Sequence, residues 1–254
     1  MSVIDAFSLA GKRALVTGGG RGLGAGMARG LAEAGARVAL VARSADQLAR
    51  TSEAIGARAT PVPWDMADPS TFPALVDRAE AALGGAIDIV LHAAGTQHRQ
   101  PAADFEPAAW DQVIAVNLSA PFFLSQEIGR RQMTADARGS HIFVGSLSSH
   151  QGLRNVVAYT ASKSGVYGLV RTLAVEWAPH GIRVNGIGPG YIETELTKAL
   201  FEDPARREEL SHRIPMGRFG SPEDMMGTAV FLASDASAYV TGQLLMVDGG
   251  WMAS

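Results

Sequence analysis

Two residues of the sequence, Tyr159 and Lys163, have the types and spacing needed for proton transfer. They lie four apart in Tyr-Thr-Ala-Ser-Lys, and residues i and i+4 share one face of a helix. A phenol has an ordinary pKa near 10, and a neighbouring ammonium group favours its ionised form. We therefore expect Lys163 to lower the pKa of Tyr159, which would act as general acid in reduction and general base in oxidation. The alternative is an ordinary pair of surface side chains.

Two further polar residues follow predicted elements and can complete such a site. Ser146 comes directly after an apolar strand pattern, at the edge where α/β sheets place their ligands. Its hydroxyl group would polarise the oxygen of a substrate. Asn117, in Val116-Asn117-Leu118, would hold a water molecule in a proton relay. The alternative for Asn117 is a hydrogen bond to the backbone that interrupts a helix.

A glycine-rich turn, Thr-Gly-Gly-Gly-Arg-Gly-Leu-Gly at 17–24, separates the first predicted strand from a helix. Glycines at such a turn let the backbone approach a pyrophosphate, and the helix N-terminus supplies free N–H groups. Gly18, Gly22 and Gly24 have GxxxGxG spacing, which differs from the more familiar GxGxxG. The turn predicts a dinucleotide site, and the alternative is a structural turn without a ligand.

The charges near this turn favour NADP(H) over NAD(H). Dinucleotide-binding folds often carry an acid after the second strand, for the ribose 2′-hydroxyl, but here that strand ends in Val41-Ala42-Arg43. Arg43, with help from Arg21, would pair with a 2′-phosphate instead. Both arginines are otherwise plain surface groups. Asp65, next to Met66, would accept a hydrogen bond from the adenine, or it caps a turn.

Short apolar runs alternate with helical patterns along the whole chain. Strands are predicted at 13–16, 38–41, 59–64, 87–91, 141–144, 182–187 and 243–247. Helices are predicted at 22–34, from 45, after 68, in two stretches over 107–133, and at 157–178. This order predicts an α/β fold of the Rossmann type, a doubly wound, seven-stranded parallel sheet with helices on both faces. We expect a single domain over 1–254, with a charged helical insertion at about 191–221 as a substrate lid.

Composition narrows the class of protein. The 254 residues are 47% apolar and 19% charged, the net charge is −3, and cysteine is absent. The chain has no basic run of the kind that nucleic-acid binders carry, no apolar stretch long enough to span a membrane, and no disulfide or thiolate chemistry. The first residues do not have a signal-peptide pattern. These observations favour a cytoplasmic enzyme that acts on a small molecule, with no nucleic-acid or membrane partner.

The sequence resembles the short-chain dehydrogenases/reductases over nearly its whole length. The resemblance is carried by the glycine-rich turn, Asn117, Ser146, the Tyr159/Lys163 pair, Pro189-Gly190 and Asp248-Gly249-Gly250. It implies NAD(P)(H)-dependent interconversion of a secondary alcohol and a ketone, and a homo-oligomer, most often a tetramer. The implied catalytic residues are Asn117, Ser146, Tyr159 and Lys163. The implied cofactor-binding residues are Gly18, Arg21, Gly22, Leu23, Gly24, Arg43, Asp65, Met66, Ala93, Ala94, Gly95, Tyr159, Lys163, Pro189, Gly190, Ile192 and Thr194.

One stretch departs from the pattern of the family. Members often carry Asn-Asn-Ala-Gly after the fourth strand, where this chain has His92-Ala93-Ala94-Gly95. Ala94 and Gly95 keep the close approach to the cofactor, whereas two amides that commonly brace the sheet are lost. We expect His92 to supply a substitute hydrogen bond.

Within the family, the segments after 189, 213 and 247 resemble gluconate 5-dehydrogenases and 2-deoxygluconate 3-dehydrogenases. A sugar acid needs a cation for its carboxylate group, and Arg154, between Ser146 and Tyr159, is the predicted partner. Arg154 would otherwise lie at a subunit interface. The predicted substrate-binding residues are Ser146, Ser148, His150, Gln151, Arg154 and Tyr159, with Gln97 and His98 as further wall residues.

Other functions fit the sequence less well. A 3-oxoacyl-thioester reductase shares the fold and motifs, but no basic cluster for an acidic carrier protein is evident. A non-catalytic dinucleotide-binding protein would not need all four catalytic residues. A serine hydrolase would need a GxSxG elbow, and the six histidines fall on separate segments without metal-ligand spacing. No metal is expected.

Overall fold

Seven parallel strands form one sheet in the computed structural model of the chain, which describes residues 2–195, 197 and 203–254. The strands are β1 (Arg13–Thr17), β2 (Arg37–Ala42), β3 (Ala59–Pro63), β4 (Ile89–His92), β5 (Gly139–Val144), β6 (Ile182–Pro189) and β7 (Leu244–Val247). Their order in the sheet is β3-β2-β1-β4-β5-β6-β7, with every neighbouring pair parallel. The predicted doubly wound fold is confirmed.

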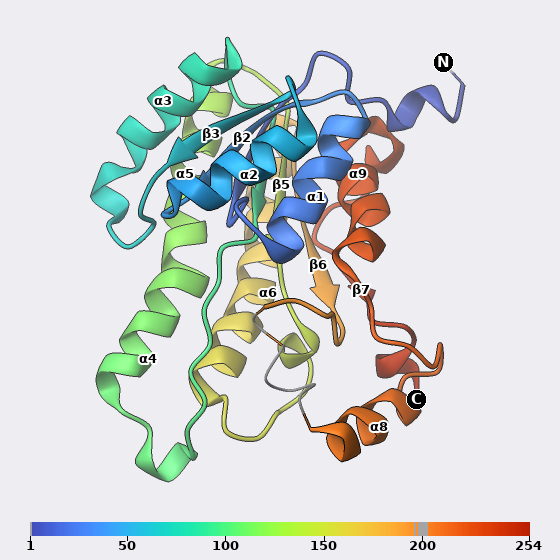
Figure 1. The fold of residues 1–254 in the computed structure, drawn as a ribbon. Coiled ribbons are helices and arrows are strands. Elements are labelled where there is room, and N and C mark those ends of the chain that lie inside the picture. The colour runs from blue at the N-terminus through green and yellow to red at the C-terminus, as the bar shows by residue number, and fades with distance from the viewer. Residues whose placement is uncertain (1, 196, 198–202) are drawn as a thin grey trace.

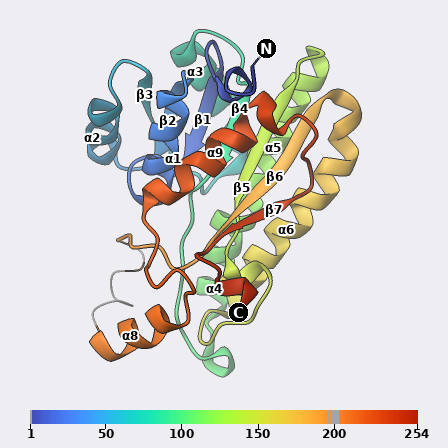
Figure 2. The same cartoon turned by 90° about the vertical axis from the view of Figure 1, so that its right-hand side faces the viewer.

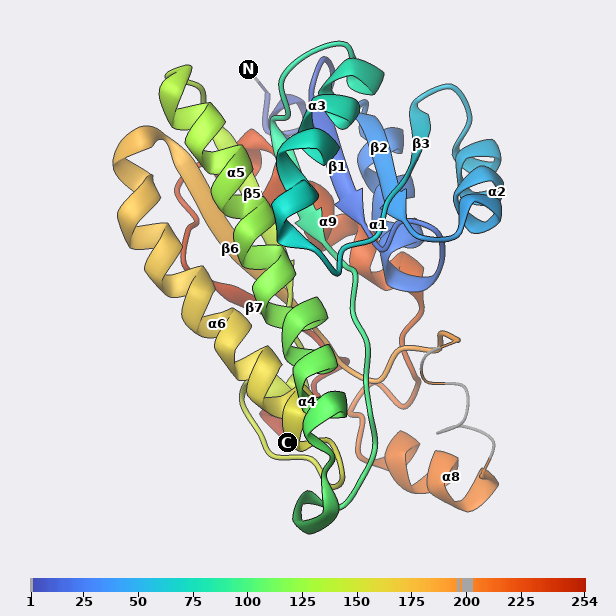
Figure 3. The same cartoon turned by 90° about the vertical axis from the view of Figure 1, so that its left-hand side faces the viewer.

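Helices cover both faces of this sheet (Figures 1 and 3). One face packs against α1 (Gly22–Glu33), α2 (Ala45–Ile55) and α9 (Met226–Ala233), and the other against α3 (Phe72–Leu83), α5 (Ala120–Thr134) and α6 (Val157–Trp177). Figure 2 shows α1 and α9 lying side by side, where Gly30 leaves room for Met226. The remaining helices, α4 (Pro107–Ile114) and α8 (Pro204–His212), lie beyond the carboxyl ends of the strands.

The strand residues divide between the two faces by simple alternation. In β1, Ala14 and Val16 join the core under α1, while Leu15 joins the core under α3. Successive strand side chains point to opposite faces, and parallel strands covered on both sides are apolar along their whole length. This is why short, uninterrupted apolar runs were enough to predict the strands.

A π-helical turn, Ala115–Ser119, joins α4 to α5. The sequence predicted two helical stretches here, and the structure shows one continuous rod whose joint carries Asn117. Such turns insert one extra residue into a helix and are frequent at functional sites. The joint therefore marks the part of this rod that faces the predicted catalytic residues.

A buried chain of hydrogen bonds braces the end of β4, where the family often has amides. His92 Nε2 lies 2.7 Å from Ser125 Oγ, and His141 Nδ1 lies 3.0 Å from the same oxygen. His141 Nε2 contacts Gln132 Oε1 at 3.0 Å, and Gln132 Nε2 donates to the carbonyl oxygen of Ile87 at 2.9 Å. His92 thus makes the substitute hydrogen bond that the sequence predicted.

The partners fix the direction of every bond in this chain. Gln132 offers its carbonyl oxygen to His141, so His141 donates from Nε2 and, as a neutral ring, accepts at Nδ1 from Ser125. Ser125 in turn accepts from His92 Nε2. Burial lowers the pKa of His141 to about 3, and burial together with the nearby His141 lowers the pKa of His92. Both rings are therefore neutral in the folded protein at neutral pH.

Folding stability should fall as the pH drops below about 6.5, the ordinary pKa of histidine. Below that value the unfolded chain takes up protons on His92 and His141, whereas the folded chain does not, because both pKa values are lowered. Each histidine then costs about 1.4 kcal/mol of unfolding free energy per pH unit. Urea unfolding between pH 7 and pH 5 measures this slope.

The variant His92→Asn keeps a donor for Ser125 but does not titrate, so its unfolding free energy should depend less steeply on pH. His180→Asn is the matched control, because His180 is exposed at the surface, and its slope should equal that of the parent protein. Equal slopes for all three proteins would contradict the assignment.

Candidate active site

Tyr159 and Lys163 lie one turn apart in the first half of α6, as predicted. Lys163 is buried, and its Nζ donates to the carbonyl oxygen of Val144 at 2.7 Å. The same nitrogen lies 5.7 Å from the centre of the Tyr159 ring. The end of β5 therefore holds the ammonium group beside the phenol without bringing the two into direct hydrogen-bond contact.

Ser146 follows β5 and faces Tyr159. Its Oγ accepts a hydrogen bond from the backbone N–H of Ser148 at 3.1 Å, and it also hydrogen-bonds Tyr159. Ser149 secures the turn, because its Oγ accepts from the N–H of Ser146 and donates to the carbonyl oxygen of Lys163. The serine loop is thus tied to the helix that carries Tyr159 and Lys163.

The predicted direction of the Tyr159 pKa shift is wrong for the free protein. Burial raises this pKa, and outweighs the hydrogen bond with Ser146 and the charge of Arg99, which both lower it. Burial also lowers the pKa of Lys163 to about 8, which weakens the positive charge beside the phenol. Spacing alone could not show that desolvation would exceed the effect of the ammonium group.

Asn117 joins the same group of side chains from the π-helical turn. Its Oδ1 accepts from the N–H of Thr96 at 2.8 Å, and its Nδ2 donates to the carbonyl oxygen of Thr96 at 2.9 Å. Nδ2 also lies 3.2 Å from Ser162 Oγ. Asn117 thus bonds the backbone of Thr96 in another segment, and together with its contact to Ser162 it ties the loop after β4 to α6. Its role in a proton relay stays a prediction.

The glycine-rich turn has the shape of a phosphate cradle. A Cβ atom on Gly18 would lie 2.7 Å from the backbone of Ala93 and Ala94, and one on Gly24 would lie 2.3 Å from the oxygen of Gly18. Gly22 has a φ of +56° and opens α1, and among the described residues its Cβ position lies 3.8 Å from Thr194. Free N–H groups at the N-terminus of α1 fit a pyrophosphate.

Other predicted cofactor residues surround this cradle. The N–H of Ala94 donates to Thr17 Oγ1 at 3.2 Å, and a Cβ on Gly95 would meet only Asn117. Pro189 ends β6, and a Cβ on Gly190 would lie 2.6 Å from Asp248. The backbone at Gly190 is therefore packed too closely for a side chain.

The residues predicted to select the cofactor have mixed surroundings. Arg43 is exposed, and Arg21 forms an ion pair with Glu195 at 2.9 Å. Met66 is buried under the sheet, while Asp65 Oδ1 accepts from the N–H of Ala67 at 3.1 Å, as a turn residue would. These contacts are compatible with binding of a dinucleotide, and the cofactor-binding roles of the four residues stay predictions.

The predicted substrate wall is only partly open to solvent. Ser148 is fully buried, Gln151 is half-buried, and Arg154 is exposed. The ring of His150 stacks edge-on against Tyr167, farther along α6 than the catalytic pair. Of the two further wall residues, Gln97 is half-buried, and His98 contacts Gln100 at 3.2 Å.

Arg99 is a functional candidate that motif and spacing did not single out. It is exposed, and its charge acts to lower the pKa of Tyr159. The sequence feature that could have identified it is a single cation directly after Gln97 and His98, in the loop that follows Gly95.

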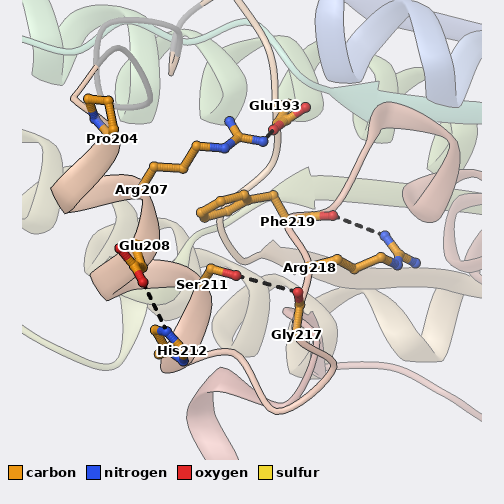
Figure 4. A pocket seen from close by; sticks show the side chains of 9 residues that line it. All are labelled: Glu193, Pro204, Arg207, Glu208, Ser211, His212, Gly217, Arg218 and Phe219. Carbon is orange, nitrogen blue, oxygen red and sulfur yellow. Dashed lines mark hydrogen bonds and ion pairs between the residues drawn. The ribbon is translucent and has the colours of Figure 1, made fainter.

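Two hollows lie near the segment between β6 and α9. One, of about 530 Å³, is lined by α8 and the loop that follows it (Figure 4), and the other, of about 350 Å³, lies between Tyr191 and Gly250. Neither is lined by Ser146 or Tyr159. We place the candidate active site at the catalytic side chains, because the chemistry of a site depends on its reacting groups rather than on the size of a hollow.

A separate apolar cluster joins α8 to the catalytic loop. Leu147, next to Ser146, is buried together with Leu210, Ile214 and Trp251. Arg213 lies over the Trp251 ring, with 4.1 Å between Cζ and the ring centre. The segment after β6 is therefore packed against the loop that carries Ser146.

The described residues form neither a metal cluster nor a membrane-spanning helix. Within residues 2–195, 197 and 203–254, no three His, Cys, Asp or Glu side chains gather in a cluster suited to a metal ion. No helix of that same part is long and apolar enough to cross a bilayer.

Comparisons with known proteins agree with this geometry. Residues 18–252 match a family described as enoyl-(acyl carrier protein) reductase. A 2-dehydro-3-deoxy-D-gluconate 5-dehydrogenase from Pseudoalteromonas atlantica is 45% identical over 98% of this chain and 99% of its own. A gluconate 5-dehydrogenase from Gluconobacter oxydans is 40% identical over 98% of both chains.

The fold comparison gives the same result. The crystal structure of a gluconate 5-dehydrogenase from Burkholderia cenocepacia, in complex with NADP and tartrate, is 40% identical to this chain. The two superpose with a TM-score of 0.94 over 100% of each chain. The predicted family resemblance is confirmed, and the chain belongs to the short-chain dehydrogenase/reductase family of NAD(P)-dependent oxidoreductases.

Proposed function

We propose that this enzyme interconverts a hydroxyl group and a ketone on an open-chain sugar acid of the gluconate or 2-dehydro-3-deoxygluconate type, with NADP(H) as the preferred cofactor. The observation that carries the proposal is the pair of Tyr159 and Lys163 on α6, held at the end of β5 beside Ser146. Arg99, whose charge acts on the pKa of Tyr159, is the proposed partner for the carboxylate group of the substrate. Relatives that act on such sugar acids cover nearly the whole chain.

In this proposal Tyr159 gives its proton to the ketone oxygen during reduction and takes it back during oxidation. The raised pKa of Tyr159 keeps the phenol protonated in the free enzyme, as an acid requires. Ser146 accepts from the N–H of Ser148 and hydrogen-bonds the phenol of Tyr159 in the free protein, and in this proposal its hydroxyl group turns its proton to the substrate oxygen when the substrate binds. A bound nicotinamide supplies the hydride to the carbonyl carbon, or accepts it in the oxidation.

Lys163 and Asn117 would serve the proton supply and the cofactor. Lys163 has a pKa lowered to about 8, so it can release or take up a proton near neutral pH. Its ammonium group would hold the nicotinamide ribose, as the family resemblance implies. Asn117, fixed between Thr96 and Ser162, would keep a relay water in place.

The preference for NADP(H) rests on Arg21 and Arg43. A Cβ on Gly20 would lie 3.6 Å from the Cβ of Ala42, so the two arginines follow backbone positions that lie near each other. Guanidinium groups bind phosphate oxygens in pairs. NAD(H) remains the alternative cofactor, because neither arginine is fixed in place by burial.

Assembly, compartment and lid are further parts of the proposal. The edge strand β7, with the sequence Leu-Leu-Met-Val, is half-exposed, and exposed apolar side chains include Trp110, Phe123 and Val175. Exposed apolar side chains and an uncovered edge strand are the surfaces that a contact between copies of the chain would bury, and the proposed assembly is a homotetramer. We also propose a cytoplasmic enzyme with one catalytic domain over 1–254, in which the insertion at about 191–221 closes over the substrate.

Initial rates with a panel of ketones test the proposed function. We expect rapid oxidation of NADPH with 5-ketogluconate or a 2,5-diketo-3-deoxy sugar acid, and slower oxidation of NADH. Acetoacetyl-coenzyme A belongs in the panel, because the matched family is described by its action on acyl carrier protein substrates. If the enzyme turned over only that thioester, the proposed sugar-acid substrate would be wrong and a 3-oxoacyl thioester would be the substrate class.

Replacing Tyr159 by Phe should lower kcat by about 100- to 10,000-fold, the usual contribution of a general acid or base. The ring remains, so the buried packing of α6 is kept, and only the phenol proton is lost. Fluorescence titration should show NADPH binding within about twofold of the parent enzyme. A variant that retained its turnover would contradict the assigned role.

Replacing Arg99 by Gln should raise KM for a keto sugar acid by about 10- to 100-fold, which corresponds to the loss of a charge-assisted hydrogen bond. A neutral ketose such as fructose should react with unchanged efficiency. Arg154→Gln is the matched control, since Arg154 is also exposed and was the cation predicted from the sequence. A raised KM in the Arg154 variant alone would restore the earlier assignment.

A further inference from the structure

An ion pair joins the glycine-rich turn to the segment that follows β6. Arg21 Nη1 lies 2.9 Å from Glu195 Oε2, although the two residues are 174 positions apart in sequence. Their side chains keep 57% and 73% of their exposure, so the pair lies at the surface and is open to exchange with other ions.

The pair spans the predicted cofactor cleft. Gly22, next to Arg21, opens α1, and a Cβ at Gly22 would lie 3.8 Å from Thr194, next to Glu195. The two segments therefore meet directly in front of the N-terminus of α1, where the pyrophosphate is expected. Arg43 follows Ala42, which lies near Gly20 in the glycine-rich turn.

We propose that Glu195 sets the cofactor preference of this enzyme by competing with the 2′-phosphate of NADP(H) for Arg21. The inference rests on the proposed NADP(H) site. It assigns to Glu195 a positioning role that acts through Arg21, without contact between Glu195 and the substrate.

The charges decide the direction of the effect. A phosphate monoester carries nearly two negative charges near pH 7 and offers three acceptor oxygens, so it is a stronger partner for a guanidinium group than one carboxylate. NADP(H) must break the ion pair to gain Arg21. NAD(H) has a hydroxyl group at that position and leaves the pair intact. Glu195 therefore weakens NADP(H) binding selectively.

A second ion pair two residues away provides a matched control. Glu193 pairs with Arg207 on α8, on the wall of the hollow in Figure 4. Glu193 has a carboxylate group of similar exposure, 49%, but its partner belongs to α8 and not to the glycine-rich turn. Glu193→Gln removes the same charge from the same segment and spares Arg21.

Fluorescence titrations with NADPH and NADH at low ionic strength test the proposal on the free enzyme. Glu195→Gln should tighten NADPH binding by about two- to fivefold, the range that a broken surface ion pair allows. NADH binding should stay within about 1.5-fold, and Glu193→Gln should leave both dissociation constants unchanged. In an Arg21→Gln background, the Glu195 substitution should have no effect on NADPH binding.

Equal changes for the two cofactors, or no change for either, would overturn the role of Glu195. That result is separate from the preference of the parent enzyme. If the parent bound NADPH no more tightly than NADH, the proposed NADP(H) preference would fail, while the ratio between parent and Glu195→Gln would still decide the present inference.

Discussion

The architecture of this protein depends on a contact between two stretches of bare backbone. The turn after β1 presses against the end of β4 so closely that a single methyl group on Gly18 would collide with Ala93 and Ala94. The strand order reverses between these two strands, and a doubly wound sheet opens a crevice where its order reverses. The contact therefore fixes the floor of the cofactor site, and the hydrogen-bonded chain behind His92 keeps the end of β4 in place.

The chemistry of the site follows from burial as much as from residue type. Tyr159 and Lys163 are both withdrawn from water, and burial favours the neutral form of each, so the pKa of Tyr159 rises while that of Lys163 falls to about 8. The phenol therefore stays protonated as an acid, and the lysine can exchange a proton near neutral pH. Two loops hold this pair in position, one through Asn117 and the other through Ser149.

The fold could be predicted from the sequence because its signals are local. Apolar runs mark strands buried on both faces, and the spacing of Tyr159 and Lys163 marks one face of a helix. Contacts between segments that are distant in sequence could not be predicted from these local signals. Neither the link from Lys163 to Val144 nor the charge of Arg99 near Tyr159 follows from spacing, since both depend on how loops and strands meet in three dimensions. The predicted direction of the Tyr159 pKa shift was wrong for the same reason, because the sequence does not show how deeply the phenol is buried.

The π-helical turn at Ala115–Ser119 has a consequence for how the rod from α4 to α5 tolerates change in length. Each residue of an α-helix turns the chain by about 100°, so the extra residue rotates α5 relative to α4 by roughly that angle. With the helix in this orientation, Leu124 and Ile128 are buried in the core against the sheet. Deleting one residue from the turn would restore a regular helix, swing the apolar stripe of α5 away from the sheet, and uncouple the packing of the core from the loop after β4.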